Sequence, residues 1–188
     1  ISVTAQPFIM GVVISVVMGI LLTMPTSSAA IWIAIASGST SDAMMLAGGA
    51  AVVGCAAQMV GFAVMSFKEN GVGGLISQGI GTSMLQIPNI MKHPLIFVPP
   101  IIASAIVGPI ATCVFKLRCT AGGGGMGTSG LVGVFGAVEA SKGVVSDANI
   151  ALAIVFLMFV IPAVVSLLFR ILFEKKGWIK GEWMKLDV

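Results

Sequence analysis

The chain has 188 residues, of which 57% are hydrophobic and 9% are charged, and its formal net charge is +3. Soluble domains carry about 25% charged residues, so the composition excludes an ordinary soluble protein and indicates an integral membrane protein. The basic residues lie in loops and near the C-terminus, which gives no support to nucleic-acid binding. Without a Walker motif, haem signature or cysteine–histidine cluster, the sequence predicts no cofactor and no metal.

The first 41 residues are uncharged and predict two helices of unequal length. Residues 8–24 are apolar and nearly long enough to cross a bilayer, which takes about 20 residues. Pro25 ends this helix. The following Thr and Ser residues predict the N-cap of a second helix over residues 29–36. This second helix is too short to cross, so we expect a half-helix.

Three further apolar segments predict full spans. Residues 44–67 are uncharged and contain pairs of small residues four apart, Ala50 with Gly54 and Ala57 with Gly61. Such spacing lets helix backbones approach closely, so we expect this helix at the centre, with both glycines touching its neighbours. Residues 95–115 and 148–173 complete a total of four predicted spans.

Two glycine-rich segments do not look like lipid-facing spans. Residues 72–91 contain the sequence GIGTSML, and residues 121–140 contain the related GMGTSGL. Open backbone survives at membrane depth only where protein buries it or where it lines a wet cavity. Paired breaks of this kind indicate the substrate site of a transporter. We therefore predict two re-entrant hairpins; the alternative is tight helix packing, which also uses Gly, Ser and Thr.

The charged C-terminal segment predicts the orientation. Residues 174–188 carry four of the ten basic residues together with Trp178 and Trp183, and Arg170 lies just before them. Basic segments favour the cytoplasmic side. With four spans, the first hairpin enters from the cytoplasm and the second from outside, so their Gly-Thr-Ser tips meet inside the membrane. The predicted fold is an all-α polytopic helix bundle, with residues 1–173 in the membrane and residues 174–188 as a cytoplasmic tail.

Neutral polar residues within the apolar segments are the candidate binding residues. Side chains of this kind face the bundle interior or a cavity, and hydroxyls with amides suit a polyol ligand such as a sugar. The alternative is hydrogen bonding between helices. The candidates are Gln58, Gln78, Thr82, Ser83, Gln86, Asn89, Thr128 and Ser129.

Two titratable residues are candidates for chemistry. Glu139 is the only carboxylate near either motif, and in a sugar site it would orient or deprotonate a hydroxyl. The alternative, which we favour, is an interfacial charge near Lys142. His93 is the only histidine; we interpret it as interfacial, with a catalytic or phosphate-handling role as the alternative. No self-contained catalytic centre is recognisable, so whether the chain is an enzyme stays open.

Several segments resemble a known family. They are QMVGFAVMS (residues 58–66), GGLISQG (73–79), TSMLQ (82–86), PNI (88–90) and GMGTSGLVG (125–133). Together they resemble the EIIC membrane proteins of the phosphotransferase system (PTS), of the second, perfringolysin-regulator-like type. Members of that family are longer, so this chain resembles the C-terminal half.

The resemblance implies a multi-pass permease of the bacterial inner membrane. It implies that a sugar binds between opposed hairpins, that a separate cytoplasmic EIIB protein phosphorylates it, and that the permease is a homodimer. A carboxylate and often a histidine lie near the sugar in such proteins, which makes Glu139 and His93 candidates by position. One alternative is a membrane-embedded regulator with the same fold and no transport. Another is an ion-coupled transporter, which needs an acidic residue in mid-span.

Overall fold

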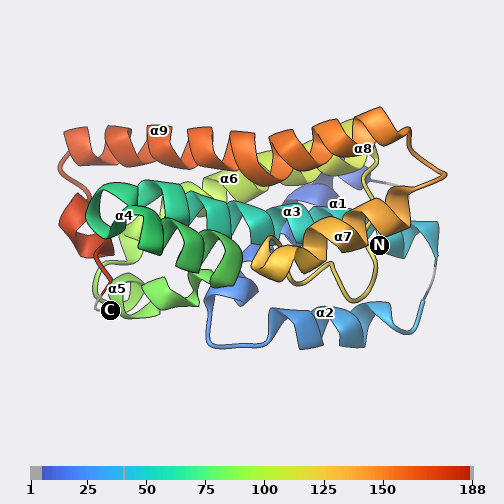
Figure 1. Ribbon diagram of the computed structural model, residues 1–188, viewed down its shortest axis with the longest axis horizontal. Helices are drawn as coiled ribbons and strands as arrows, with labels where there is room; N and C mark the ends of the chain where they lie inside the picture. The colour runs from blue at the N-terminus through green and yellow to red at the C-terminus, as the bar shows by residue number, and fades with distance from the viewer. Residues whose placement is uncertain (1–5, 40, 187–188) are drawn as a thin grey trace.

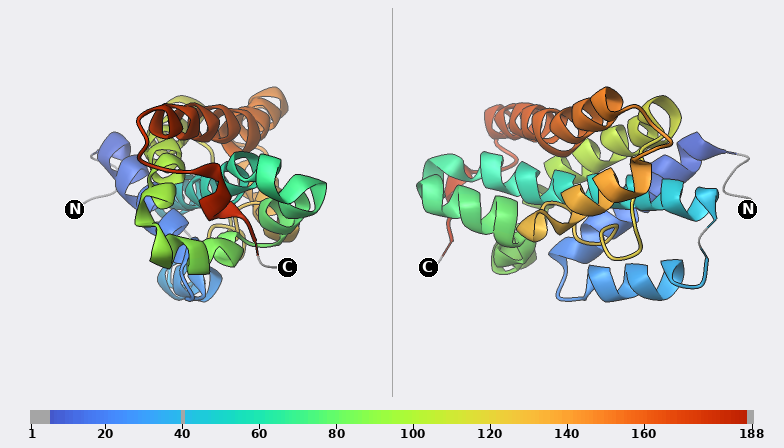
Figure 2. Two further views of the ribbon diagram at one scale, coloured as in Figure 1. Left: turned by 90° about the vertical axis from the view of Figure 1, so that its left-hand side faces the viewer. Right: turned by 45° about the vertical axis from the view of Figure 1, so that its right-hand side comes forward.

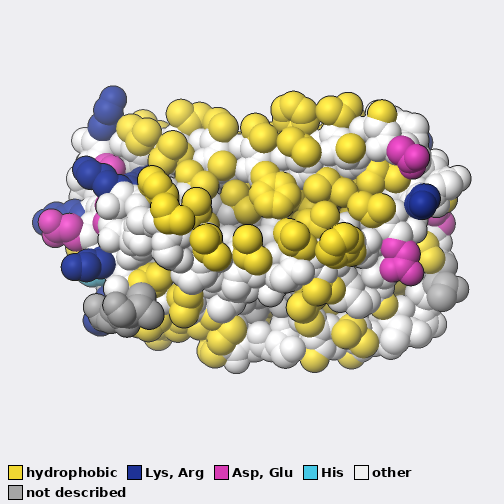
Figure 3. Space-filling model, viewed as in Figure 1, with side chains coloured by type: hydrophobic (Ala, Val, Ile, Leu, Met, Phe, Trp, Pro, Cys, Tyr) yellow, Lys and Arg dark blue, Asp and Glu magenta, His cyan; other side chains and the backbone are white. Residues whose placement is uncertain are grey.

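The computed structural model describes residues 6–39 and 41–186. Within these residues every regular element is a helix, and the only β-type pairing is an isolated bridge between Lys142 and Val145. The helices form an elongated bundle (Figure 1). The face shown in Figure 3 is apolar along most of its length and carries its charged side chains at the two ends. The predicted all-α fold is confirmed.

Helix α3 (Asp42–Met65) is the centre of the bundle. The Ser41 hydroxyl caps its N-terminus by accepting a hydrogen bond from the Met44 amide at 3.3 Å. Almost every residue from Ala47 to Met65 is buried. The end-on view in Figure 2 shows other helices on all sides of α3. The main neighbours are α1 (Pro7–Thr23), α6 (Val98–Pro109) and α9 (Ile161–Lys175).

The small residues of α3 allow this close packing, as predicted. A Cβ atom added to Gly54 would overlap the backbone of Ser15 in α1. A Cβ atom added to Gly61 would lie 2.7 Å from the hydroxyl of Ser166 in α9 and 3.1 Å from Pro100 in α6. Interiors packed this densely accept little extra volume. The expected central position of this helix and its glycine contacts are confirmed.

Three helical runs in the described part of the chain are long and apolar enough to cross a membrane. They are α3, the run Pro94–Phe115 and the run Asp147–Lys175. The second run joins η3 (Pro94–Phe97), α6 and η4 (Ile110–Phe115), and the third joins α8 (Asp147–Ala153), η6 (Ile154–Val160) and α9. They correspond to three of the four predicted spans. Residues 8–24 form α1, which has 17 residues and is one of the shorter apolar helices, so the count of four stays a prediction.

Helices α1 and α2 (Ser28–Ala36) form a helical hairpin. The Ser27 hydroxyl caps α2 by accepting a hydrogen bond from the Ala30 amide at 3.3 Å, so the predicted half-helix and its cap are present. In Figures 1 and 2, α2 runs back toward the end of the bundle at which α1 begins. The turn between them, residues 24–27, therefore lies within the length of the bundle.

The two glycine-rich segments also fold back on themselves. The first hairpin (residues 67–92) consists of α4 (Phe67–Ile76), η1 (Ser77–Gly81), η2 (Ser83–Gln86) and α5 (Ile87–Lys92). The second hairpin (residues 116–141) consists of a loop, η5 (Ser129–Leu131) and α7 (Val132–Ser141). In Figure 1 the first hairpin lies at the end where α9 finishes, and α7 runs toward the opposite end, beside α8. That both hairpins enter a membrane stays a prediction.

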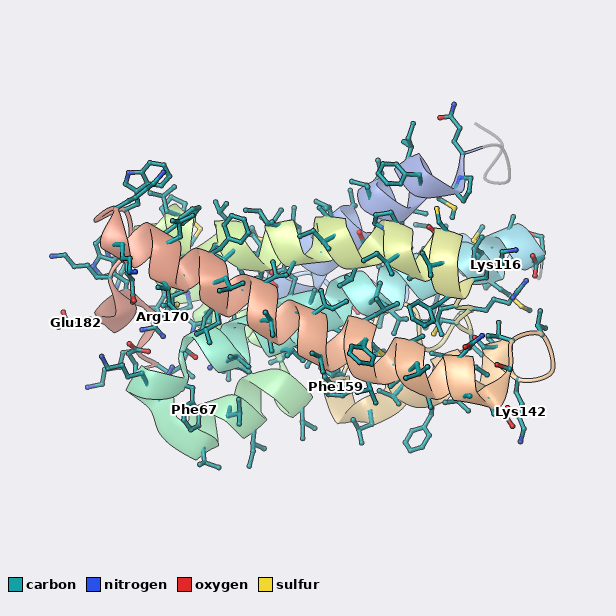
Figure 4. All side chains as sticks on the ribbon, turned by 90° about the horizontal axis from the view of Figure 1, so that it is seen from above. Phe67, Lys116, Lys142, Phe159, Arg170 and Glu182 are labelled. Carbon is teal, nitrogen blue, oxygen red and sulfur yellow. The ribbon has the colours of Figure 1, made fainter. Side chains whose placement is uncertain are left out.

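The charged residues are divided unequally between the two ends. Figure 4 shows Arg170 and Glu182 at one end and Lys116 and Lys142 at the other. The first end, where the tail lies, carries the larger group of basic residues: Lys68, Lys92, Arg170, Lys175, Lys176, Lys180 and Lys185. At the other end Lys116, Arg118 and Lys142 are balanced by Asp42, Glu139 and Asp147.

Candidate functional site

The two Gly-Thr-Ser motifs are in direct contact, buried at Thr128 and exposed at Gly81. The Thr128 hydroxyl donates to the Gly79 carbonyl at 2.6 Å, and the Ser129 hydroxyl donates to the Gly81 carbonyl at 3.0 Å. The side chains of the second motif therefore bind the backbone of the first. Although the motifs are far apart in sequence and lie on different hairpins, the fold brings their tips into direct contact.

Irregular backbone geometry leaves the carbonyl groups at the hairpin tips free to accept hydrogen bonds from side chains. Residues 77–81 form a π turn, after which Thr82 is extended (φ −160°, ψ 142°). The Thr82 hydroxyl accepts a hydrogen bond from the Met84 amide at 3.1 Å and caps η2. In the second motif Gly127 and Gly130 have left-handed backbone angles (φ +56° and +52°). These irregular turns interrupt the helical ladder, so carbonyls such as those of Gly79 and Gly81 accept bonds from side chains.

The turn between α1 and α2 joins the same place. The Thr23 and Ser83 hydroxyl oxygens lie 2.8 Å apart, and the Ser28 hydroxyl donates to the Gly125 carbonyl at 2.8 Å. Three breaks in the helices thus converge. We call the group Thr23, Ser28, Ser83, Thr128 and Ser129 the hydroxyl junction. Thr23 and Ser28, which flank the Pro25 break, were not among the predicted binding residues.

The hydroxyl junction is neutral and closed in this conformation. Thr23, Ser83 and Thr128 are fully buried, Ser28 is nearly so, and Ser129 is half-buried. Each hydroxyl is paired with another hydroxyl or with a backbone carbonyl, and none of these bonds involves a charged side chain. A ligand entering here must replace these bonds with its own, because a buried polar group left unpaired costs about 1–3 kcal/mol.

The predicted amides lie elsewhere, in a network of their own. The Gln86 amide nitrogen donates at 2.9 Å to both the Gln78 side-chain oxygen and the Met184 carbonyl. The Asn89 amide nitrogen donates at 2.9 Å to both the Gln86 side-chain oxygen and the Lys185 carbonyl. Gln86 and Asn89 therefore bind the C-terminal tail, and Gln78 is joined to it through Gln86. Their role in substrate binding stays a prediction.

Gln58 lies fully buried in the middle of α3. Its amide nitrogen donates to the Ser104 hydroxyl at 3.4 Å, while its side-chain oxygen has no partner among the described residues. Such buried, unpaired acceptors are uncommon in proteins. Gln58 thus keeps one free hydrogen-bonding position inside the bundle, but its side chain forms no hydrogen bond with a described residue of the hydroxyl junction.

Glu139 and His93 are at opposite ends of the molecule. Glu139 is exposed on the last turn of α7, close in sequence to Lys142, which Figure 4 places at one end. His93 follows α5 at the other end (Figure 1) and stacks on Trp183, with ring centroids 3.9 Å apart and planes inclined by 6°. The two residues do not form a common site in this conformation. Among the described residues no group of three or more His, Cys, Asp or Glu side chains is placed to hold a metal ion.

Comparison with known proteins identifies the family. Residues 1–186 match the family described as "Phosphotransferase system, EIIC". No curated protein and no solved structure gives a significant match. The family match covers nearly the whole chain and agrees with the apolar helical bundle and its long hydrophobic helices. The chain belongs to the EIIC family, the integral membrane permease components of the phosphotransferase system.

Proposed function

We propose that the chain is part of a sugar permease that binds a sugar or related polyol at the hydroxyl junction, between the two hairpins. A separate cytoplasmic EIIB protein then phosphorylates the sugar. The observation that carries this proposal is the direct contact of the two tips, through the Thr128–Gly79 and Ser129–Gly81 hydrogen bonds. Binding sites of transporters are commonly built where broken helices meet near the middle of the membrane.

The chemistry of the hydroxyl junction matches that of a polyol. A sugar hydroxyl both donates and accepts hydrogen bonds, so it is able to replace the Thr128 hydroxyl at the Gly79 carbonyl and to bind the freed hydroxyl in turn. This exchange leaves no buried polar group unpaired, which an ionic or apolar ligand would not achieve. The junction therefore favours a neutral, hydroxyl-rich ligand.

The position of the two hairpins provides a route to each side. Since they belong to opposite ends of the bundle (Figure 1), movement of one hairpin away from the junction opens it toward that end. The end with the larger group of basic residues is the cytoplasmic one by the positive-inside rule. The first hairpin then faces the compartment of the EIIB protein, and the second faces the outside. A homodimer, as the family resemblance implies, is part of this proposal.

Neither titratable candidate contacts the hydroxyl junction in this conformation. Glu139 is exposed at one end and His93 is held by Trp183 at the other. The proposal therefore gives the binding contacts to Ser83, Thr128 and Ser129. The phosphoryl group comes from the EIIB protein, and no residue of this chain is required to carry it.

Sugar binding by hydroxyl variants tests this proposal. Thr128→Val keeps the side-chain volume and removes the hydroxyl, and Ser129→Ala removes the second tip hydroxyl. A panel of labelled sugars is measured against the full-length protein in nanodiscs. Each variant is expected to bind the recognised sugar about tenfold more weakly, as the loss of roughly 1.4 kcal/mol implies.

The matched control is Thr112→Val, which also removes a buried threonine hydroxyl. Thr112 donates to the Pro7 carbonyl at 2.8 Å, at the interface of η4 and α1, away from the junction. It is expected to leave sugar affinity unchanged. Unchanged affinity in both tip variants, or equal weakening in the Thr112 control, contradicts a sugar site at the junction. Binding without EIIB-dependent phosphorylation favours the regulator instead.

A further inference from the structure

The end of the described chain folds back onto the first hairpin. After α9 the backbone turns at Gly177, which has a left-handed φ of +72°. Ile179 and Met184 are then buried in a cluster that also contains residues of α3 and α5, and Leu186 is buried as well. The side chains between them, such as Glu182 and Lys185, are exposed. Residues 181–186 therefore form a strap with one buried and one exposed side, which we call the latch.

Side chains of the first hairpin bind the backbone of the latch. The Met184 carbonyl accepts hydrogen bonds from Asn70 at 2.8 Å and from Gln86 at 2.9 Å. Asn70 lies near the start of the hairpin and Gln86 near its return, so a single latch carbonyl joins both legs. The Leu186 amide donates to the Asn70 side-chain oxygen at 2.8 Å, and the Lys185 carbonyl accepts from Asn89 at 2.9 Å.

The same network reaches the tip of the hairpin. Gln86, which holds the latch, also donates to Gln78, and Gln78 donates to the Ser66 hydroxyl at 2.8 Å, at the end of α3. Gln78 directly precedes Gly79, whose carbonyl receives the Thr128 hydroxyl. Two buried glutamines therefore connect the latch with the contact between the two hairpin tips. Buried networks of this kind stabilise one arrangement when every member is paired.

Little else holds the outer leg of the hairpin. In α4 only Gly74 is buried, while Val72 is 62% exposed and Ile76 is 54% exposed. Gly71 interrupts α4 with φ +60° and ψ −157°, and a Cβ atom there would meet nothing within 4 Å. A glycine with open space around it accommodates large changes of backbone angle. Gly71 is thus a suitable hinge for the leg that leads to the tip.

The base of the hairpin is held separately. Arg170 of α9 donates to both carboxylate oxygens of Glu69, at 2.6 and 3.0 Å, and to Glu174 at 3.0 Å. Since Glu69 and Asn70 both come before the hinge at Gly71, neither of them directly restrains the leg beyond it; the latch reaches that part of the hairpin through Gln86 and Asn89. Release of the latch therefore frees the moving part of the hairpin while its base stays attached to the bundle.

We propose that the latch is a conformational restraint on the first hairpin. Bound to Asn70, Gln86 and Asn89, it holds the hairpin where its tip meets the second hairpin; its release lets the leg move about Gly71 and opens the hydroxyl junction on that side. The purpose of this opening rests on the proposed sugar permease function. The restraint itself is a property of the fold and is measurable without any sugar.

Hydrogen–deuterium exchange of the full-length protein in nanodiscs tests the restraint. Asn70→Ala removes two of the latch contacts, and Met184→Asp places a charge in a buried apolar position. In both variants the backbone amides of residues 77–86 are expected to exchange about tenfold faster, because local opening becomes more frequent. The control Lys185→Ala changes an exposed side chain and keeps the backbone bond to Asn89, so it is expected to exchange like the parent.

Residues 132–141 of the second hairpin serve as an internal reference. Faster exchange there as well as in residues 77–86 means general unfolding. If Met184→Asp shows this, the milder Asn70→Ala variant tests the latch instead. Unchanged exchange of residues 77–86 in folded Asn70→Ala overturns the latch. Sugar affinity is measured on the same samples, so loss of the sugar site and loss of the latch give separate results.

Discussion

Glycines at matching positions of the two motifs have different physical roles. Gly127 has a left-handed φ of +56°, and a Cβ atom there would lie 2.7 Å from the Ala56 amide nitrogen and 2.9 Å from the Cys55 Cβ. A Cβ atom added to Gly81, the corresponding residue of the first motif, would meet nothing within 4 Å. Gly127 is therefore required for the second tip to lie against α3, whereas Gly81 faces open space.

Alanine substitution should separate the two glycines. Gly127→Ala is expected to lower the melting temperature in detergent by several degrees. The left-handed conformation costs a non-glycine residue about 1–2 kcal/mol, and the contact with α3 adds to this. Gly81→Ala is expected to leave the melting temperature unchanged. Equal melting temperatures for the two variants would mean that the second tip is not packed against α3 in solution.

The sequence predicted the polar residues of the tips better than their partners. Thr128 and Ser129 were recognisable because hydroxyls beside paired glycines are unusual in apolar segments. Ser28 was missed because helix capping after Pro25 already explained its hydroxyl, and Thr23 was missed because it lies within the apolar segment 8–24. Gln86 was recognised as a buried amide in need of a partner, but the partner is the Met184 backbone carbonyl, 98 positions away. Every residue except proline has the same backbone groups, so no sequence pattern marks that choice.

At the scale of elements, α3 determines how closely the other helices approach. Gly54 lies against α1 and Gly61 lies between α6 and α9. Both contacts were predictable, because small residues four apart mark one close-packed face. The type of helical turn was less predictable from the sequence. The π turn η6 (Ile154–Val160), for example, contains neither glycine nor proline. Its seven residues carry no local signal that separates π from α hydrogen bonding, which the surrounding packing decides.

Overpacking tests the central position of α3. Gly61→Leu places a side chain against the Ser166 hydroxyl and Pro100 and is expected to destabilise the bundle by about 1–3 kcal/mol. Thermal unfolding and the monodisperse fraction after purification should both decrease. Gly38→Leu is the control, because a Cβ atom at Gly38 meets nothing within 4 Å. An unchanged melting temperature for Gly61→Leu would contradict the central packing of α3 in the membrane.

At the scale of the whole molecule, three helix breaks from different parts of the chain meet at one place. Two of them, the glycine-rich hairpins, were predicted to meet from opposite sides. The third was not: the break at Pro25 and the short helix after it were predicted, but not that α2 runs back beside the bundle (Figure 1). Apolar length alone does not give the direction of a short helix such as α2, which packs against α1 and against Gly124 and Gly125 of the second hairpin.

The charges at the two ends predict which one faces the cytoplasm. Lys92 is the last residue of α5, which lies at the end with the larger group of basic residues (Figure 1). Lys142 lies at the end where basic and acidic residues balance (Figure 4). Lys92→Cys and Lys142→Cys are made separately after Cys55, Cys113 and Cys119 are replaced by alanine. Because basic segments are retained on the cytoplasmic side, an impermeant maleimide should label Lys142→Cys in intact cells and Lys92→Cys only after permeabilisation. The reverse pattern would mean that the protein has the opposite orientation in the membrane, with the first hairpin and the latch on the outside. Labelling of both in intact cells would show that the two ends do not lie on opposite faces of the membrane.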